Sequence, residues 1–172
     1  LQTNIIIDKM NPISNQKDSK PSAKQIIISK IDIKAGDLTF GQRIELGQIM
    51  SNSVLSDLDK FEKTFLCLHN YKPKATEYSA LINYFGDICK GIAFWTNQEA
   101  TLLKYEPSAK EKRAGIKDLS LKTGDLGTIK ALAKNYSQDP DDVLLWKYGK
   151  VFGILYTDLE EYKYQLKYSE LK

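Results

Sequence analysis

The sequence predicts a mainly α-helical protein, a small helical bundle with a short N-terminal β arm or hairpin. Two observations predict the helices. From residue 40 onward apolar residues recur at helical spacing, and residues typical of helix starts precede several of these stretches. A third observation, runs of consecutive isoleucines near the N-terminus, predicts the β arm, because β-branched residues favour strands.

The composition is that of one globular domain. The 172 residues, of which 42% are hydrophobic, are enough to form a buried core. We expect residues 1–24 to form a flexible or arm-like segment and residues 25–172 a single helical domain. No stretch approaches the roughly 20 apolar residues of a membrane span, so no membrane association is expected. No internal repeat and no sustained heptad pattern are evident.

The net charge of +3 is concentrated near the N-terminus. Residues 1–30 contain five lysines and two aspartates, whereas positive and negative residues cancel in the rest of the chain. A dedicated nucleic-acid surface needs cations clustered on a folded face. The charge distribution therefore argues against nucleic acid as a partner.

The N-terminal region combines a polar segment with apolar runs. Residues 8–24 are polar and contain two prolines, which is typical of disorder or of an arm that orders on binding. Isoleucine runs flank this segment at Ile5–Ile7 and Ile26–Ile28. We expect these runs to form two short strands, which would pair as a hairpin or add to the sheet edge of a partner.

The first helix is expected to begin after Thr39. Thr39 and Gln42 have the spacing of a capping box, in which each side chain bonds to the backbone N–H of the other residue. The helical period then places Phe40 and Ile44 toward the core and Arg43 toward solvent.

Three further helices are expected in the middle of the chain. One begins after Ser56 and ends at Pro73, and a long one covers residues 77 to about 105. Gly86 and Gly91 would bend this long helix or admit a close neighbour. A short, solvated helix is expected within residues 108–120.

The C-terminal region is predicted to be a helical hairpin over residues 126–168. Its first helix is Leu126–Tyr136. Asp139 has the chemistry of an N-cap and Pro140 suits the first helical position. From Val143 to Leu166 an apolar stripe continues without a proline, so we expect one long second helix.

The last helix is unusually rich in aromatic residues. Either all of them pack in the core or some of them form a docking surface, since exposed aromatic residues are favoured at interfaces. Gly149 and Gly153 would let a second helix approach beside them. The candidate partner-binding residues are Phe94, Trp95, Trp146, Tyr148, Phe152 and Tyr156.

Residues for catalysis or metal binding are not evident. Cys67 and His69 offer two metal ligands, but a second pair that would complete a tetrahedral site is missing. Cys67 and Cys89 are expected to be reduced, buried thiols. Carboxylates near Asp139 are explained by helix capping, and no glycine-rich phosphate loop is present. We therefore expect no enzymatic activity, no catalytic residue, no metal and no cofactor.

A helix-turn-helix is the strongest alternative that involves DNA. Residues 126–154 have roughly its spacing of two helices and a turn. In that motif the N-terminal residues of the second helix face bases and phosphates. Here these residues are Asp141 and Asp142, which phosphates would repel. We therefore favour a hairpin that serves packing, with DNA binding as the second alternative function.

Several segments together resemble a known protein family. They are DLTFGQRIELGQI, DKFEKTFLCLHNY, a long helix with Phe and Trp, and ALAKNYSQDPDDVLLWKYGKVFGILYTDLEEYKYQLKY. From about Ile31 to Lys172 the chain resembles the tail assembly chaperones of long-tailed bacteriophages and prophages. The resemblance implies a non-enzymatic protein that binds a tape-measure or tail protein and keeps this apolar helical client soluble during assembly.

The resemblance also implies a location, the cytoplasm of the bacterial host. A homo-oligomer is a further assembly that the apolar helices would serve. The first alternative function is a structural virion component, such as a neck or tail-completion protein, which would remain in the mature particle.

Overall fold

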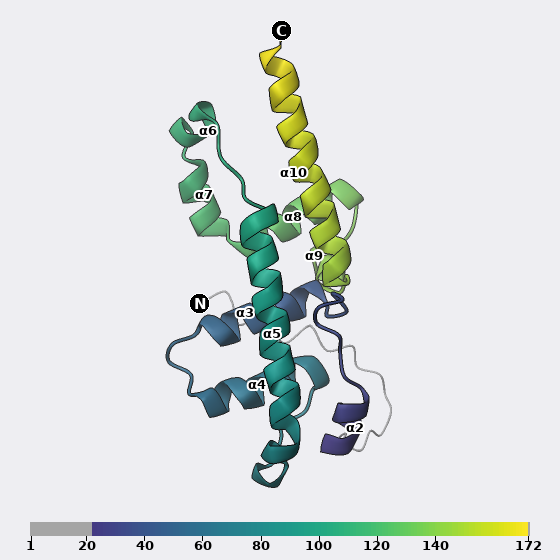
Figure 1. Ribbon diagram of the computed structural model, residues 1–172. Coiled ribbons are helices and arrows are strands. Elements are labelled where there is room, and N and C mark those ends of the chain that lie inside the picture. Colours follow the sequence, from purple (N-terminus) through teal and green to yellow (C-terminus); the bar gives the residue numbers. More distant parts are fainter. Residues whose placement is uncertain (1–21, 172) are drawn as a thin grey trace.

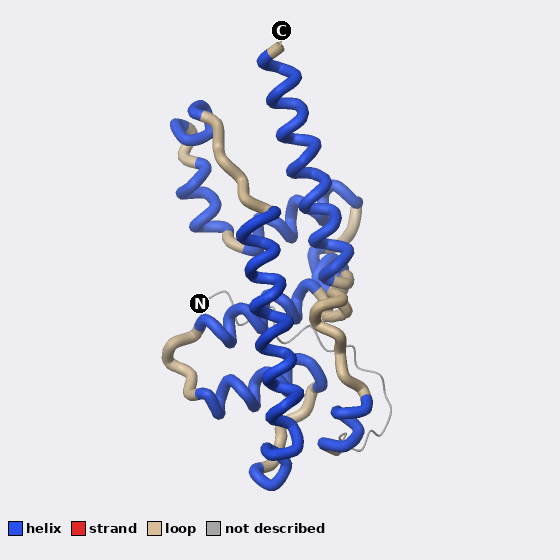
Figure 2. Tube along the Cα trace, in the orientation of Figure 1, coloured by secondary structure: helices blue, strands red, loops and turns tan. Residues whose placement is uncertain are grey.

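The computed structural model describes residues 22–171, which form a mainly helical fold without a strand (Figures 1 and 2). This confirms the predicted helical class. In chain order the elements are α2 (Ala23–Ile28), α3 (Phe40–Ser51), α4 (Asp57–His69), the 3₁₀ turn η1 (Ala75–Glu77), α5 (Tyr78–Leu102), α6 (Ala109–Arg113), α7 (Ile116–Thr123), α8 (Asp125–Tyr136), α9 (Pro140–Leu144) and α10 (Tyr148–Glu170).

Helix α5 runs through the middle of the molecule and is contacted by elements from both ends of the chain. Helices α3 and α4 pack on each other, and α2 and α3 pack on α5 (Figure 1). Helix α10 lies farther along the same axis and extends beyond the end of α5, with the C-terminus at its tip. The fold thus combines a packed region around α5 with a projecting C-terminal helix.

The strand predicted at Ile26–Ile28 is wrong, because this stretch is helical. The Gln25 N–H donates to the Ser22 hydroxyl at 3.4 Å and the Ser22 N–H donates to the Gln25 side chain at 2.7 Å, so a capping box starts α2. Ile26 is buried in the core, which favours the helix over its β propensity. The other predicted strand, Ile5–Ile7, lies outside the described residues, as does most of the predicted arm over residues 1–24.

The predicted helix starts at Thr39, Ser56 and Asp139 are confirmed. The Gln42 N–H donates to the Thr39 hydroxyl at 3.1 Å, and the Asp59 N–H donates to the Ser56 hydroxyl at the same distance. Asp139 accepts a hydrogen bond from the backbone of the second residue after it. Each cap satisfies backbone N–H groups that have no partner within the helix.

The prediction of one long C-terminal helix after Asp139 is wrong in one respect, because this helix is divided in two. Helix α9 ends at Leu144 and α10 begins at Tyr148. Between them the backbone pairs with the segment before α3, since the Phe40 N–H donates to the Trp146 carbonyl and the Tyr148 N–H donates to the Leu38 carbonyl, both at 2.8 Å. The expected hairpin over residues 126–168 therefore consists of three helices.

The same contact provides the N-terminal cap of α10. Its N-cap residue, Lys147, makes no side-chain capping bond. Instead, the Gly149 N–H donates to the Gly36 carbonyl at 3.2 Å, and the Tyr148 N–H is bound as described above. Lys147 forms a salt bridge with Asp37 at 2.8 Å. Residues 36–40 therefore hold the start of α10 in place.

The short helix predicted within residues 108–120 is also divided. Helices α6 and α7 are separated by Gly115, which has a φ of 81°. This conformation favours glycine and is incompatible with a continuous right-handed helix.

Gly91 on α5 admits a close neighbour, as expected, and that neighbour is Ile33. A Cβ atom on Gly91 would lie 2.6 Å from the Cβ and Cγ2 atoms of Ile33. We expect Gly91→Ala to lower the free energy of unfolding by about 1–3 kcal/mol, because the buried Ile33 must move. Urea denaturation measures this change.

Gly86→Ala is the matched control on the same helix. A Cβ atom there meets nothing within 4 Å. The substitution should raise the free energy of unfolding by about 0.5–1 kcal/mol, because alanine is the better helix former. Equal effects at Gly86 and Gly91 would contradict the close packing of Ile33 against α5.

Candidate partner-binding surface

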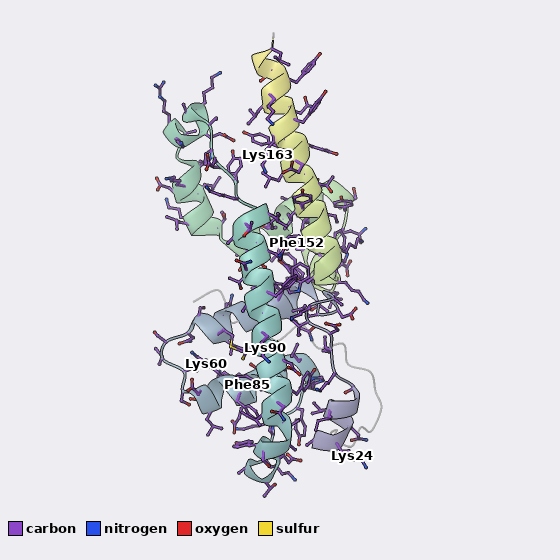
Figure 3. All side chains as sticks on the ribbon, viewed as in Figure 1. Lys24, Lys60, Phe85, Lys90, Phe152 and Lys163 are labelled. Carbon is purple, nitrogen blue, oxygen red and sulfur yellow. The ribbon has the colours of Figure 1, made fainter. Side chains whose placement is uncertain are left out.

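Four of the six predicted partner-binding residues meet where α5 runs beside α10. Trp95 is central: its ring centroid lies 5.4 Å from that of Phe94, 5.0 Å from that of Tyr148 and 5.1 Å from that of Phe152. Phe152 is labelled in Figure 3 beside the end of α5. These residues, about 55 positions apart along the chain, form one aromatic cluster.

Two members of this cluster are core residues rather than surface residues. Trp95 is 8% exposed and Tyr148 is 3% exposed. The indole N–H of Trp95 donates to the Ile33 carbonyl at 2.5 Å, which satisfies its polar atom inside the protein. Little of either side chain is therefore accessible to a partner, and both support the more exposed aromatic residues from below.

The other two members of the cluster, Phe94 and Phe152, are accessible, and so is Tyr156 on α10. Phe94 is 38% exposed, Tyr156 is 40% exposed and Phe152 is half-buried. Tyr156 follows Phe152 by one turn on α10, and a Cβ atom added to the nearby Gly153 would meet nothing within 4 Å. We call Phe94, Phe152 and Tyr156 the aromatic surface.

Trp146, the sixth predicted residue, lies apart from this surface. It is half-buried in the connection between α9 and α10, where its ring packs edge-on against Tyr136 at a centroid distance of 5.5 Å. The Lys150 ammonium lies 4.0 Å from the centroid of the Trp146 ring. This cation–π contact and the packing on Tyr136 already occupy much of the indole.

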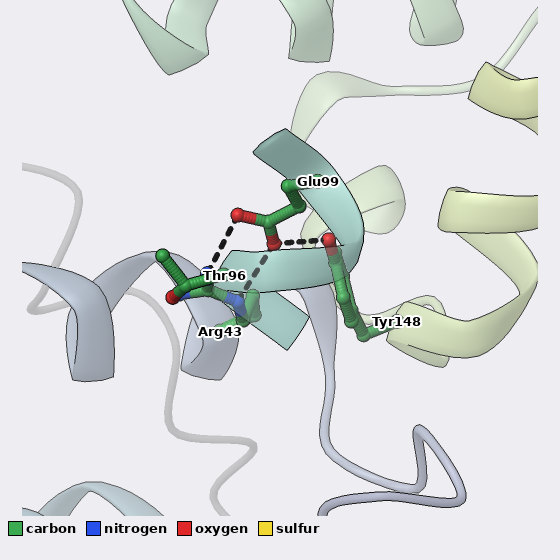
Figure 4. A network of polar contacts seen from close by, with 4 residues as sticks. All are labelled: Arg43, Thr96, Glu99 and Tyr148. Atoms are coloured by element: carbon green, nitrogen blue, oxygen red, sulfur yellow. Dashed lines mark hydrogen bonds and ion pairs between the residues drawn. The ribbon is translucent and has the colours of Figure 1, made fainter. Parts of the chain in front are cut away.

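A network of polar side chains lies beneath the aromatic cluster and links α3, α5 and α10 (Figure 4). Arg43 on α3 donates to both carboxylate oxygens of Glu99 on α5, at 2.9 and 2.7 Å, and to the hydroxyl of Thr96 at 3.1 Å. Tyr148 on α10 donates its hydroxyl proton to Glu99. Burial and the neighbouring carboxylate raise the pKa of the Tyr148 hydroxyl, which therefore stays a hydrogen-bond donor.

This network corrects the prediction that Arg43 faces solvent. The Arg43 side chain is only 9% exposed. No local pattern identifies its partner, because Glu99 is 56 residues away along the chain. In the sequence, Arg43 is marked only by its position as a charged residue among the apolar residues of α3. The network fixes the positions of the helices that present the aromatic surface.

A second polar contact joins the segment after α5 to the far part of α10. The Tyr105 hydroxyl donates to Glu111, and the Tyr162 hydroxyl lies 3.2 and 3.3 Å from the two Glu111 carboxylate oxygens. The hydrogen bond from Tyr105, followed by those from Ser108, lowers the pKa of Glu111 to about 2. Near neutral pH this carboxylate is charged and joins α6 to α10.

The cysteine and histidine side chains that were candidates for metal binding have surroundings that indicate a structural role. His69, half-buried at the end of α4, has its Nε2 atom 3.0 Å from the Tyr84 hydroxyl, and burial lowers its pKa. Cys67 and Cys89 are free thiols whose pKa values are raised, chiefly by burial, so the reactive thiolate is disfavoured. Among residues 22–171 there is no group of three His, Cys, Asp or Glu side chains placed to hold a metal ion.

The second helix expected for a helix-turn-helix is α9, which has only five residues. It ends where residues 146–148 pair with residues 38–40. A recognition helix that lies along the major groove needs greater length than α9 provides. The geometry gives no support to DNA binding by this segment.

Comparisons with known proteins do not assign a family. No protein-family model, curated protein or solved structure matches the chain. Within the described residues, no helix combines the length and apolar character needed to cross a membrane. The function is therefore inferred from the residues themselves.

Proposed function

We propose that this protein is a non-enzymatic binding protein of the tail-assembly-chaperone kind, which holds an apolar helical segment of a tape-measure or tail protein during phage tail assembly. One structural observation supports the binding role: the aromatic surface of Phe94, Phe152 and Tyr156. The phage context is supported by the sequence resemblance between residues 31 and 172.

The aromatic surface has the physical properties of an anchor for an apolar helix. Its side chains project from two long helices, and Phe94 and Phe152 pack on the buried Trp95. Aromatic side chains held in this way lose little conformational entropy on binding, so more of the apolar burial contributes to affinity. A client helix would place residues at i, i+3 and i+4 against such a surface.

The position of Trp95 decides which substitutions can test this proposal. Alanine at Trp95 or Tyr148 would destabilise the core, so a loss of binding could come from a loss of folded protein and not from a lost contact with the client. Phe94 and Tyr156 are the most exposed residues of the aromatic surface. Ile82, also on α5 and 53% exposed, lies three turns before Phe94 and provides a matched apolar control.

The test is co-expression of the tagged full chain with the tape-measure and tail-tube proteins encoded near it. We expect the tape-measure protein to be retained in a soluble complex. The double variant Phe94→Ala with Tyr156→Ala should bind it at least tenfold more weakly at nearly unchanged melting temperature, because two exposed anchors are removed. Ile82→Ala should bind as the unsubstituted chain does.

Two outcomes would contradict the proposal. Loss of binding in Ile82→Ala equal to that in the double variant would exclude the aromatic surface as the binding site. Failure to retain any tape-measure protein, together with the presence of this chain in purified particles, would favour the structural virion component.

A further inference from the structure

One face of α10 carries a heptad pattern that continues past the core. Its apolar residues follow one another at intervals of four and three, the spacing of a and d positions in a coiled coil. They are Tyr148, Phe152, Leu155, Leu159, Tyr162 and Leu166. The first three pack in or against the hydrophobic core, whereas Leu159, Tyr162 and Leu166 belong to no part of it. We call these last three residues the distal stripe.

The distal stripe lies on the part of α10 that extends beyond α5 (Figure 1). Leu166 is 37% exposed, and Leu159 and Tyr162 are half-buried. Tyr162 is contacted on one side, where its ring centroid lies 5.6 Å from that of Tyr105. Leu159 and Leu166 lie one turn before and one turn after it. The core-facing side of α10 thus continues for about two turns as an incompletely covered apolar face.

Charged residues beside the distal stripe complement each other between two parallel copies of α10. Asp158 occupies a g position and Lys163 an e position of the heptad. In a parallel pair of helices each g residue lies beside the e residue five positions further along the other helix, so Asp158 of each copy faces Lys163 of the other. An antiparallel pair centred on the stripe would instead bring the two Lys163 side chains together.

Both charged residues are available for this pairing. Asp158 is exposed and forms no salt bridge with another described residue. Lys163 pairs with Glu160 at 2.7 Å, but both side chains are close to half exposed. Surface pairs of this type contribute little, so Lys163 can exchange one partner for another at small cost.

We propose that a second copy of this chain covers the distal stripe. The two α10 helices pack in parallel, with Leu159, Tyr162 and Leu166 at their interface and Asp158 paired with Lys163 in both directions. A twofold pair of this kind uses the same surface on each copy. The interface is about one heptad, or two helical turns, long, so the dimer is reversible. It does not depend on the proposed function, because none of its interface residues belongs to the aromatic surface.

Charge exchange on the full chain tests both the dimer and its direction. Sedimentation equilibrium over a range of concentrations should show a monomer–dimer equilibrium. Asp158→Lys and Lys163→Asp should each weaken the dimer about tenfold, because each places like charges together at both pairs. The chain with both substitutions should regain the original affinity. Mixing the two single variants should give a heterodimer in preference to either homodimer.

The apolar part of the interface has its own matched pair. Leu166→Ala should weaken the dimer, whereas Tyr164→Ala, on the opposite face of α10, should not. Both positions lie outside the core, so circular dichroism should show unchanged helix content. A chain that stays monomeric at every concentration would overturn the proposal. So would a dimer that responds equally to Asp158→Lys and to the double exchange.

Discussion

Replacing Arg43 with methionine is expected to lower the free energy of unfolding by about 2–4 kcal/mol. The substitution keeps the long apolar part of the side chain but removes the guanidinium that binds both oxygens of Glu99. The Glu99 carboxylate would then lose its cation and keep the hydrogen bond from the buried Tyr148 hydroxyl. Urea denaturation, followed by circular dichroism, measures the change.

A second substitution separates the loss of the ion pair from a loss of packing. In the double variant Arg43→Met with Glu99→Met no carboxylate is left without its cation. Replacement of a buried ion pair by apolar residues is often neutral, so the double variant should regain much of the lost stability. A single variant within 0.5 kcal/mol of the unsubstituted chain would show that the Arg43–Glu99 pair contributes little.

Gly36→Ala should destabilise the protein by about 3 kcal/mol or more. Gly36 has a φ of 75°, and a Cβ atom there would lie 2.7 Å from the N and Cα atoms of Gly149. An alanine side chain at position 36 is therefore disfavoured both by the backbone conformation and by contact with the backbone of Gly149. Because the Gly36 carbonyl accepts a bond from the Gly149 N–H, the start of α10 should also loosen. Thermal unfolding and faster amide exchange at Tyr148 and Gly149 would show both effects.

Gly149→Ala is the control from the other side of the same contact. Its added Cβ atom would lie 3.4 Å from the nearest atom, the Ala35 carbonyl oxygen, which is an ordinary contact distance. We expect at most a small change in stability, since the gain in helix propensity offsets any small adjustment. If Gly149→Ala were as damaging as Gly36→Ala, neither the positive φ of Gly36 nor its shorter contact would explain the effect of Gly36→Ala.

Features encoded by neighbouring residues were predictable from the sequence. The capping box at Thr39 and the helix start at Ser56 depend on residues three positions apart, and the structure contains both. Ser22 and Gln25 form the same motif, yet the isoleucines after them suggested a strand. The cap and the burial of Ile26 outweigh the β propensity of Ile26–Ile28.

Features that depend on distant residues were not predictable. The apolar stripe continues through Leu145–Lys147, so the break before α10 follows only from the pairing with residues 38–40. Similarly, aromatic content identified the residues of the candidate surface but not which of them are exposed. Trp95 and Phe94 are neighbours in sequence, and only the packing of Ile33 and α10 on Trp95 makes one core and the other accessible.

The pairing between residues 36–40 and 146–149 also constrains how the chain folds. Asp37 and Lys147 are 110 residues apart, so this contact closes a large loop. Closing such a loop is entropically costly, and contacts between distant residues slow folding. On the ribosome, helices α3 to α5 emerge well before Trp146, and Trp95 cannot pack against Tyr148 and Phe152 until α10 has been made. The last step of folding therefore follows synthesis of the C-terminal helix.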